Sequence, residues 1–346
     1  MNKEYKTTFA FSALALCLVL GACGKNAAQI GNARAGEQSG QITFAVTAPG
    51  VTENPNIENN EKTGDINGAG VPDALPEQVA RTENGTGALY GKKTGTSKTF
   101  TGLEPLPQRK LTVNDPDNTR RLSENAVSHS YGVSKDGKPH EISVNNQKIY
   151  EKYGGLCLDT SGQKVIYLTF DCGYENGVTE RILDTLKQKK VPAAFFVTLP
   201  YIESAPETVA RMINEGHTVG NHSDTHPNFA NITRTQMAKE IETVDNTLRE
   251  KFGYSAPFFR FPEGAYSESA LELVESLGFK SVFWSSAYAD WDVNAQKGAD
   301  YAFETVTKRL HPGCVLLLHA VSSDNADALG RIIDYARAEG YSFVSL

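Results

Sequence analysis

The sequence predicts an α/β fold, an imperfect (β/α) barrel of about seven strands that follows a long disordered tether. Two patterns lead to this prediction. Residues 165–170 are mostly β-branched and aromatic, and glycines at 173 and 177 interrupt the chain soon after them, as expected for a buried strand. Beyond this strand, helical and strand patterns alternate to the end of the chain. Such alternation predicts parallel strands with helices packed outside them.

The elements expected after the first strand alternate regularly. Helices are expected at residues 179–190, 205–215, 233–252, 267–277, 301–310 and 324–339. Strands are expected at residues 193–198, 217–220, 258–261, 281–284, 314–318 and 342–344. In folds of this class, side chains converge on a ligand at the carboxyl ends of the strands.

The N-terminal residues have the layout of a secretory signal. A short positively charged start precedes an apolar run over residues 9–20, which ends in Leu20-Gly-Ala-Cys23. This ending resembles a bacterial lipobox, where cleavage precedes a cysteine that is then lipidated. Residues 1–22 are therefore expected to be a lipoprotein signal peptide, and lipidated Cys23 to hold the protein on the outer face of the plasma membrane. The alternative is an ordinary signal with a chance cysteine.

Residues 23–117 are expected to form a flexible linker. Gly, Asn, Thr, Glu and Ala dominate this segment, aromatic residues are few, and no helical or strand periodicity is sustained. Such a segment cannot bury enough apolar surface to offset the entropy lost on ordering. Residues 118–346 are expected to form the folded domain, in which residues 122–162 pack on the barrel as a lead-in.

Composition and cysteine usage exclude several classes. The 346-residue chain has a net charge of −7 and no long basic block, so nucleic acid is not an expected partner. None of the five cysteines lies in a CxxC pair, which excludes a zinc ribbon. Cys157 and Cys314 should both lie at the bottom of the barrel, either bridged or as free thiols. Cys172 should lie at the mouth, too far from Cys314 to pair with it.

Ionisable side chains come directly after several of the expected strands. Asp171 ends the first strand, where it could also be an ordinary helix cap. His222 and His226 are four residues apart, so on a helical turn both could bind one metal ion. The other candidates are Arg260, Trp284, Asp290, Trp291 and His319, each of which could also be structural, as a surface ion pair, a core aromatic residue or a loop cap.

Five elements in this order resemble the polysaccharide deacetylases, the NodB-like domain of carbohydrate esterase family 4. They are Thr169-Phe-Asp-Cys-Gly173, His222-Ser-Asp-Thr-His226, Arg260-Phe-Pro-Glu-Gly264, Asp290-Trp291 and Leu317-Leu-His319. The resemblance covers roughly residues 130–346. The stretches at residues 167–177 and 317–326 look most similar to the delta-lactam-biosynthetic de-N-acetylases of peptidoglycan.

The resemblance implies hydrolysis of an acetamide assisted by a divalent metal ion. Asp171 would act as general base, and Arg260 would orient it and keep it ionised. His222 and His226 would hold the ion. Where the family has a second, metal-binding Asp, this chain has Cys172. Its thiolate would favour zinc or another transition metal, and the alternative is a site with only two protein ligands.

The resemblance also implies roles on the other side of the site. His319 would protonate the departing amine, and Asp290 would keep that imidazole charged. Leu317 and Trp291 would floor an apolar pocket for the acetyl methyl group, and Tyr174 would bind substrate.

The expected activity is de-N-acetylation of peptidoglycan glycan strands, at N-acetylmuramic acid. One alternative is deacetylation of N-acetylglucosamine in peptidoglycan or chitin-like chains. Another is a catalytically silent carbohydrate-binding lipoprotein that has lost its metal through Cys172, although a protein that only binds sugar has no use for a full acid–base set.

Overall fold

The computed structural model of the protein describes residues 87–346. The expected signal peptide and the first part of the expected linker lie outside the described residues. Within the described chain, no helix is both long and apolar enough to cross a membrane.

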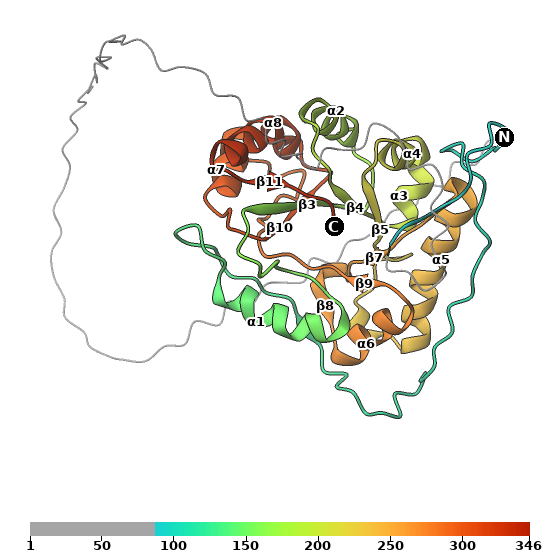
Figure 1. Cartoon of the computed structure of the whole chain (residues 1–346). Coiled ribbons are helices and arrows are strands. Elements are labelled where there is room, and N and C mark those ends of the chain that lie inside the picture. The colour runs from blue at the N-terminus through green and yellow to red at the C-terminus, as the bar shows by residue number, and fades with distance from the viewer. Residues whose placement is uncertain (1–86) are drawn as a thin grey trace, which may run out of the picture. The chain divides into compact units, whose positions relative to one another are not determined.

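A seven-stranded parallel sheet lies at the centre of this part of the chain (Figure 1). Its main path runs in the order β10 (Cys314–His319), β3 (Val165–Cys172), β4 (Ala194–Val197), β5 (Thr218–Asn221), β7 (Phe258–Phe259) and β9 (Lys280–Ser281). The remaining strand, β11 (Ser342–Phe343), pairs with the start of β3. Every pair in this sheet is parallel, so the predicted α/β architecture is confirmed.

Hydrogen bonds beyond the regular strands join the two edges of this sheet. The backbone N–H groups of Ser285 and Ser286, which come after β9, donate to Val315 O in β10 at 2.9 and 3.2 Å. Leu317 N donates in return to Ser286 O at 2.9 Å. The predicted imperfect (β/α) barrel is therefore confirmed, with an irregular segment where a closed barrel would have another regular strand pair.

Side chains of β3 alternate between two environments, as they must along a strand. Residues 166, 168, 170 and 172 belong to one hydrophobic cluster with residues of the surrounding helices, such as Leu186 and Leu329. By the same alternation, Tyr167, Thr169 and Asp171 face the barrel interior. Each β3 residue thus serves either the core or the site, and its position in the strand decides which.

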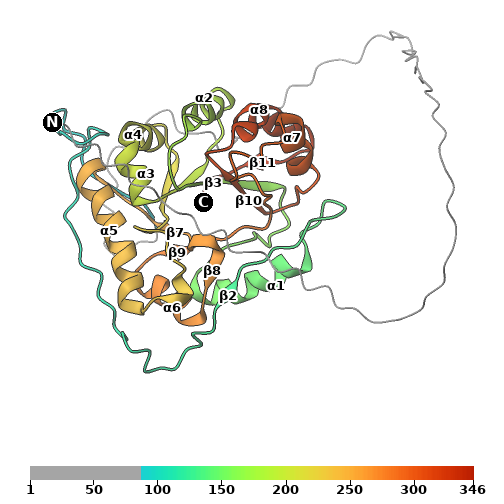
Figure 2. The same cartoon turned by 180° about the vertical axis from the view of Figure 1, so that it is seen from behind.

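Helices cover the outer face of the sheet, as the two opposite views show (Figures 1 and 2). They are α2 (Thr179–Lys189), α3 (Leu199–Ser204), α4 (Pro206–Asn214), α5 (Arg234–Phe252), α6 (Glu268–Ser276), α7 (Ala299–Thr307) and α8 (Ser323–Ala338). All except α3 are predicted from the sequence to within a few residues. Thr198, expected at the end of a strand, instead caps α3 by accepting a hydrogen bond from Tyr201 N at 3.3 Å.

The lead-in packs on the barrel as predicted. β2 (Val127–Ser128) pairs antiparallel with β8 (Ala265–Tyr266), and helix α1 (Glu141–Tyr150) comes next in the chain after β2. The fully buried ring of Tyr150 stacks on Phe283 with ring centroids 4.2 Å apart.

Residues 87–117 are ordered against the barrel, which corrects the expected boundary of the flexible linker. β1 (Leu89–Tyr90) pairs antiparallel with β6 (Tyr254–Ser255). Phe100 N and Leu106 N donate to carbonyl groups in the last turn of α5 at 3.0 and 2.9 Å. These bonds come from the backbone, so they leave no periodic pattern of apolar side chains in the sequence.

Gly253 allows this segment to approach the end of α5. It terminates the helix in the left-handed region, with φ +62°. A Cβ atom at this position would lie 2.3 Å from Glu104 O, so only glycine fits both the turn and the passing backbone.

The three described cysteines are free and buried. The backbone bridge between Leu158 and Cys314 confirms that Cys157 and Cys314 lie in the same region. Their side chains belong to different hydrophobic clusters, so the two thiols are not bridged.

A chain that begins at Asn118 should unfold at lower denaturant concentration than a matched chain that begins at Gly87. We expect a loss of at least about 1 kcal/mol in the free energy of unfolding, the net worth of a single hydrogen bond, because several are removed. Equilibrium unfolding in urea, followed by circular dichroism, measures the difference. Equal midpoints and slopes would show that residues 87–117 add no stability.

Candidate active site

The ionisable candidates meet at the carboxyl ends of the parallel strands, as the sequence predicts. Asp171 and His319 are the facing residues of β3 and β10 in the strand register. His222 comes directly after the last residue of β5, and Arg260 directly after β7. Strand order therefore brings residues almost 150 positions apart to one end of the barrel.

Arg260 and Asp171 form a buried ion pair. Arg260 Nη1 donates to Asp171 Oδ1 at 2.8 Å, and the guanidinium is 0% exposed. Its other groups are also bonded: Nη2 donates to Thr169 Oγ1 at 3.0 Å and Nε to Val282 O at 2.9 Å. The cation also lies 4.1 Å from the ring centroid of Phe196.

This environment keeps Asp171 ionised. Burial alone would raise the pKa of the carboxyl group, but the charge of Arg260, its hydrogen bond to Asp171 and the charge of His319 outweigh burial and hold that pKa below its usual value. Asp171 can therefore accept a proton from a nucleophile at neutral pH.

His319 is held by Asp290 through two hydrogen bonds. His319 Nδ1 lies 2.6 Å from Asp290 Oδ1, and the backbone N–H of His319 donates to Asp290 Oδ2 at 2.8 Å. Burial lowers the pKa of the imidazole, but the Asp290 carboxylate more than compensates, so the pKa of His319 is raised. With Nδ1 directed at Asp290, Nε2 is the nitrogen left to give a proton to a leaving group.

His222 and His226 lie together, although not on the expected helical turn. Their ring centroids are 4.9 Å apart. Ser223 and His226 adopt left-handed backbone conformations, with φ 72° and 57°, so a tight loop turns His226 back toward His222. Ser223 Oγ stabilises the loop by accepting a hydrogen bond from His226 N at 3.0 Å.

The two imidazoles fit a divalent metal ion in their chemistry. Burial lowers the pKa of His222 to about 4, so this imidazole is neutral, as a metal ligand must be. His226 is exposed, and partial desolvation of its ring also lowers its pKa. His222 Nδ1 lies 2.9 Å from Arg260 O, which leaves Nε2 directed toward Asp171 Oδ2 at 3.6 Å. Within residues 87–346, no three His, Cys, Asp or Glu side chains are grouped as a complete ligand set.

The expectation that Cys172 binds a metal is corrected by the structure. Its side chain is 0% exposed and belongs to the helix-facing cluster, on the opposite face of β3 from Asp171. Burial raises the pKa of the thiol well above its usual value, so it stays protonated. Cys172 is therefore a core residue, and of the three metal ligands expected from the sequence only His222 and His226 lie at this end of the barrel.

The residues expected to bind substrate differ in exposure. Leu317 is 3% exposed and precedes His319 by two positions, so it lies on the same face of β10. Trp291, which directly follows Asp290, is 60% exposed. Tyr174, two residues beyond the end of β3, is 50% exposed. Leu317 is thus placed to form an apolar floor, whereas Trp291 and Tyr174 are open to solvent.

Sequence reasoning missed three residues that hold the candidates in place. Thr169 precedes Asp171 by two positions, so strand alternation could have placed it on the same face. Asn325 donates from Nδ2 to Asp290 Oδ2 at 2.5 Å, and Tyr288 donates from its hydroxyl to Asn325 Oδ1 at 2.5 Å. The sequence assigns no role to these two residues, because they meet only through the packing of α8 on the loop between β9 and α7.

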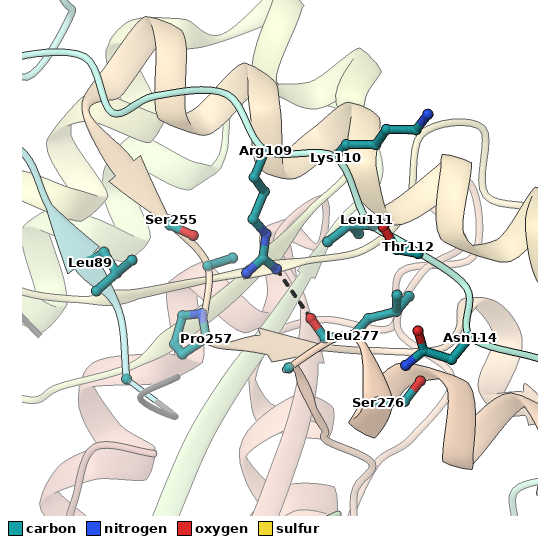
Figure 3. Close-up of a pocket in the computed structure, with 13 residues that line it drawn as sticks. Leu89, Arg109, Lys110, Leu111, Thr112, Asn114, Ser255, Pro257, Ser276 and Leu277 are labelled. Carbon is teal, nitrogen blue, oxygen red and sulfur yellow. Dashed lines mark hydrogen bonds between the residues drawn. The ribbon is translucent and has the colours of Figure 1, made fainter. Parts of the chain in front are cut away.

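A separate cavity of about 420 Å³ lies at the other end of the strands (Figure 3). Its lining includes Pro257, which precedes β7, and Gly278, which precedes β9. Arg109 projects into it and donates from Nη2 to Leu277 O at 3.4 Å. None of the candidate catalytic residues lines this cavity.

Comparisons with known proteins agree with the geometry of the site. The family model described as polysaccharide deacetylase matches residues 159–282. The chain is 40% identical over 221 residues to the peptidoglycan-N-acetylmuramic acid deacetylase PdaA of Bacillus subtilis. This match covers 64% of this chain and 84% of PdaA. It is 42% identical over 226 residues to an uncharacterised 30.6 kDa protein of Geobacillus stearothermophilus, covering 65% of this chain and 85% of that protein.

The fold is also similar to a solved structure. The structure of Bacillus subtilis PdaA, a family 4 carbohydrate esterase, superposes with a TM-score of 0.62 at 38% sequence identity. The match covers 64% of this chain and 95% of that structure.

Replacing Cys172 with alanine should leave metal affinity unchanged, because the thiol faces the helices. The variant should lose about 1 kcal/mol of stability, as is typical of a core truncation. Competition against a chromophoric zinc chelator measures the dissociation constant, and urea unfolding measures stability. His222→Ala is the matched variant, for which zinc binding should weaken. Equal weakening of zinc binding in Cys172→Ala and His222→Ala would show that Cys172 is a metal ligand.

Proposed function

We propose that this chain, which belongs to the polysaccharide deacetylase family (carbohydrate esterase family 4), removes the acetyl group from N-acetylmuramic acid in peptidoglycan and releases acetate. Membership makes the chain a hydrolase that acts on amide bonds. The observation that carries the proposal is the register of β3 and β10, which sets Asp171 beside His319. The similarity to PdaA supports the muramic acid as the sugar.

The two residues have opposite protonation states, as the reaction requires. Asp171, ionised beside Arg260, takes the proton of the water that attacks the acetamide carbonyl. His319, protonated beside Asp290, gives its Nε2 proton to the amine as the C–N bond breaks. The products are acetate and a free amino sugar.

A divalent ion is part of this proposal, held by His222 and His226. When bound, such an ion supplies Lewis-acid polarisation of the acetamide carbonyl. The neutral state of both imidazoles and the bond between His222 Nδ1 and Arg260 O support this assignment. We keep zinc or another transition metal as the ion, since imidazole nitrogen suits these metals.

The remaining substrate contacts are inferred from exposure. Leu317 would floor the slot for the acetyl methyl group, next to the acid His319. The exposed rings of Trp291 and Tyr174 would contact the glycan strand, because aromatic faces offer sugar rings a large apolar surface.

The proposal includes a location outside the cytoplasm, where peptidoglycan is found. The lipobox-like sequence ending at Cys23 supports a lipid anchor on the outer face of the plasma membrane. The anchored chain would then act on glycan strands in the wall.

The purified chain should release acetate from peptidoglycan glycan strands and leave de-N-acetylated muramic acid. Digestion of the treated strands and mass spectrometry of the fragments identify which sugar lost its acetyl group. Loss from N-acetylglucosamine alone would replace the proposed sugar. Binding of strands without any release of acetate would instead favour a silent carbohydrate-binding protein.

Asp171→Asn and His319→Ala should each lower acetate release by about 10²–10⁴-fold, the usual worth of general acid–base catalysis. Enzymatic determination of acetate gives the rates. Asp159→Asn is the matched control: its carboxylate lies near the opposite end of β3, where it accepts a hydrogen bond from Tyr167, and it should keep normal turnover. Near-normal turnover in either catalytic variant would contradict the assignment.

Asp290→Asn should move the alkaline limb of the kcat/KM profile to lower pH. The active form of His319 is protonated, so activity is present below the pKa of His319 and is lost as the pH rises through it. Asp290 raises that pKa, and removing its charge therefore lowers it. Rates measured across neutral and alkaline pH test the shift, and an unmoved alkaline limb would mean that another group sets it.

A further inference from the structure

We propose that Asn325 is a positioning residue for the catalytic acid, and that its amide, held in place by Tyr288, orients the Asp290 carboxylate that holds His319. The inference rests on the proposed function, since it gives Asn325 a part in protonation of the leaving amine. Tyr288 lies outside the sequence elements that resemble the family, and Asn325 lies in the stretch 317–326, for which the resemblance gave it no role.

The first contact is between Asn325 and Asp290. Asn325 Nδ2 donates to Asp290 Oδ2 at 2.5 Å and also lies 3.3 Å from His319 O. Asn325 is 0% exposed and Asp290 3% exposed, so water does not compete for these bonds. The same Oδ2 atom accepts the backbone N–H of His319, so both oxygens of the carboxylate are bonded in one orientation.

The second contact fixes which end of the Asn325 amide faces Asp290. The hydroxyl of Tyr288 donates to Asn325 Oδ1 at 2.5 Å. Burial, followed by the charges of Asp290 and Asp324, raises the pKa of Tyr288, so its hydroxyl stays protonated and remains a donor. A flipped amide would lose this bond and would point its oxygen at the Asp290 carboxylate.

The carboxylate needs this support because Asp290 lies in a loop. Between β9 and α7 no helix or strand holds it. Asn325, by contrast, is in the first turn of α8, where its backbone N–H donates to the N-cap oxygen of Ser322 at 3.2 Å. Rotation about χ2 of an aspartate is soft, so the amide on the rigid helix defines the plane of the carboxylate.

The charges that face His319 show why orientation matters. They are Asp290, Asp171 and Arg260, with the titratable imidazole of His226 beside them, and of these groups only Asp290 is hydrogen-bonded to the imidazole of His319. A carboxylate that rotated away from Nδ1 would weaken the interaction that keeps His319 protonated. It would also release the ring that must direct Nε2 to the leaving amine.

The test is Asn325→Leu in the full chain, which removes the three hydrogen bonds of the side-chain amide and keeps similar size. We expect kcat to fall about 10–100-fold, by analogy with the loss of an outer partner that orients a metal-binding imidazole, with KM nearly unchanged. The alkaline limb of kcat/KM should move to lower pH. Titration of the His319 ring followed by NMR should show the same downward shift in its pKa.

Two further variants separate positioning from a loss of structure. Tyr288→Phe removes only the hydroxyl that fixes the Asn325 amide. It should move the alkaline limb of the kcat/KM profile to lower pH, by less than Asn325→Leu does. Asp327→Ala is the matched control on the same helix. The Asp327 carboxylate is exposed and accepts a hydrogen bond from Arg181 Nη1 at 2.5 Å, away from Tyr288 and Asp290, so the His319 titration should not move.

The outcomes distinguish this inference from the proposed function. A lower rate in Asn325→Leu with an unmoved limb and an unmoved His319 titration would overturn the positioning role. If Asn325→Leu fails to fold, an unmoved titration in Tyr288→Phe would overturn it equally. If the wild type releases no acetate from any strand, the proposed function fails, and the NMR titration still decides whether Asn325 controls His319.

Discussion

The buried pair of Arg260 and Asp171 is the interaction on which the site and the barrel both depend. A guanidinium that is 0% exposed is tolerated only when its charge and its N–H groups are satisfied. Arg260 meets this condition by donating to Asp171 and Thr169 of β3 and to Val282 just beyond β9. One side chain from the end of β7 thus ties together strands that are not adjacent in the sheet. Removing one partner of such a pair typically costs about 3–5 kcal/mol, so the fold preserves the group that keeps the base ionised.

The same end of the barrel sets two neighbouring groups to opposite protonation states. Asp171 and His319 face each other across β3 and β10, yet the first is held ionised by a cation and the second protonated by an anion. Asp171 is 8% exposed and the side chain of His319 is 24% exposed, and desolvation alone would neutralise each of them. Arg260 and Asp290 reverse the effect of burial, each through direct hydrogen bonds. Acid and base are therefore distinguished by their partners and not by depth, which is the arrangement an acid–base hydrolase needs.

Much of this could be predicted from the sequence because it depends on local patterns. The parallel strands and the helices that follow β3, except α3, have periodic apolar residues, and the catalytic candidates stand directly after strands. Features without such a pattern were missed. Residues 87–117 bind through backbone hydrogen bonds and a few scattered side chains such as Leu103 and Phe100, without a periodic pattern. His226 reaches His222 through left-handed residues that are not glycine. The network of Tyr288, Asn325 and Asp290 joins a loop to a helix that comes later in the chain, so only the packed structure reveals it.

Cys172 shows how strand alternation limits what a motif can imply. It is the residue directly after the base, and proximity in sequence suggested a shared site. A strand sends consecutive side chains to opposite faces, so as long as β3 continues through residue 172, the residue after Asp171 is directed to the helices. There it packs with the apolar residues of β3, and a small, weakly polar thiol suits that cluster better than a carboxylate would. The base on one face and the core on the other are therefore independent, and a change at position 172 can be absorbed by the core without displacing Asp171, Arg260 or the imidazole pair.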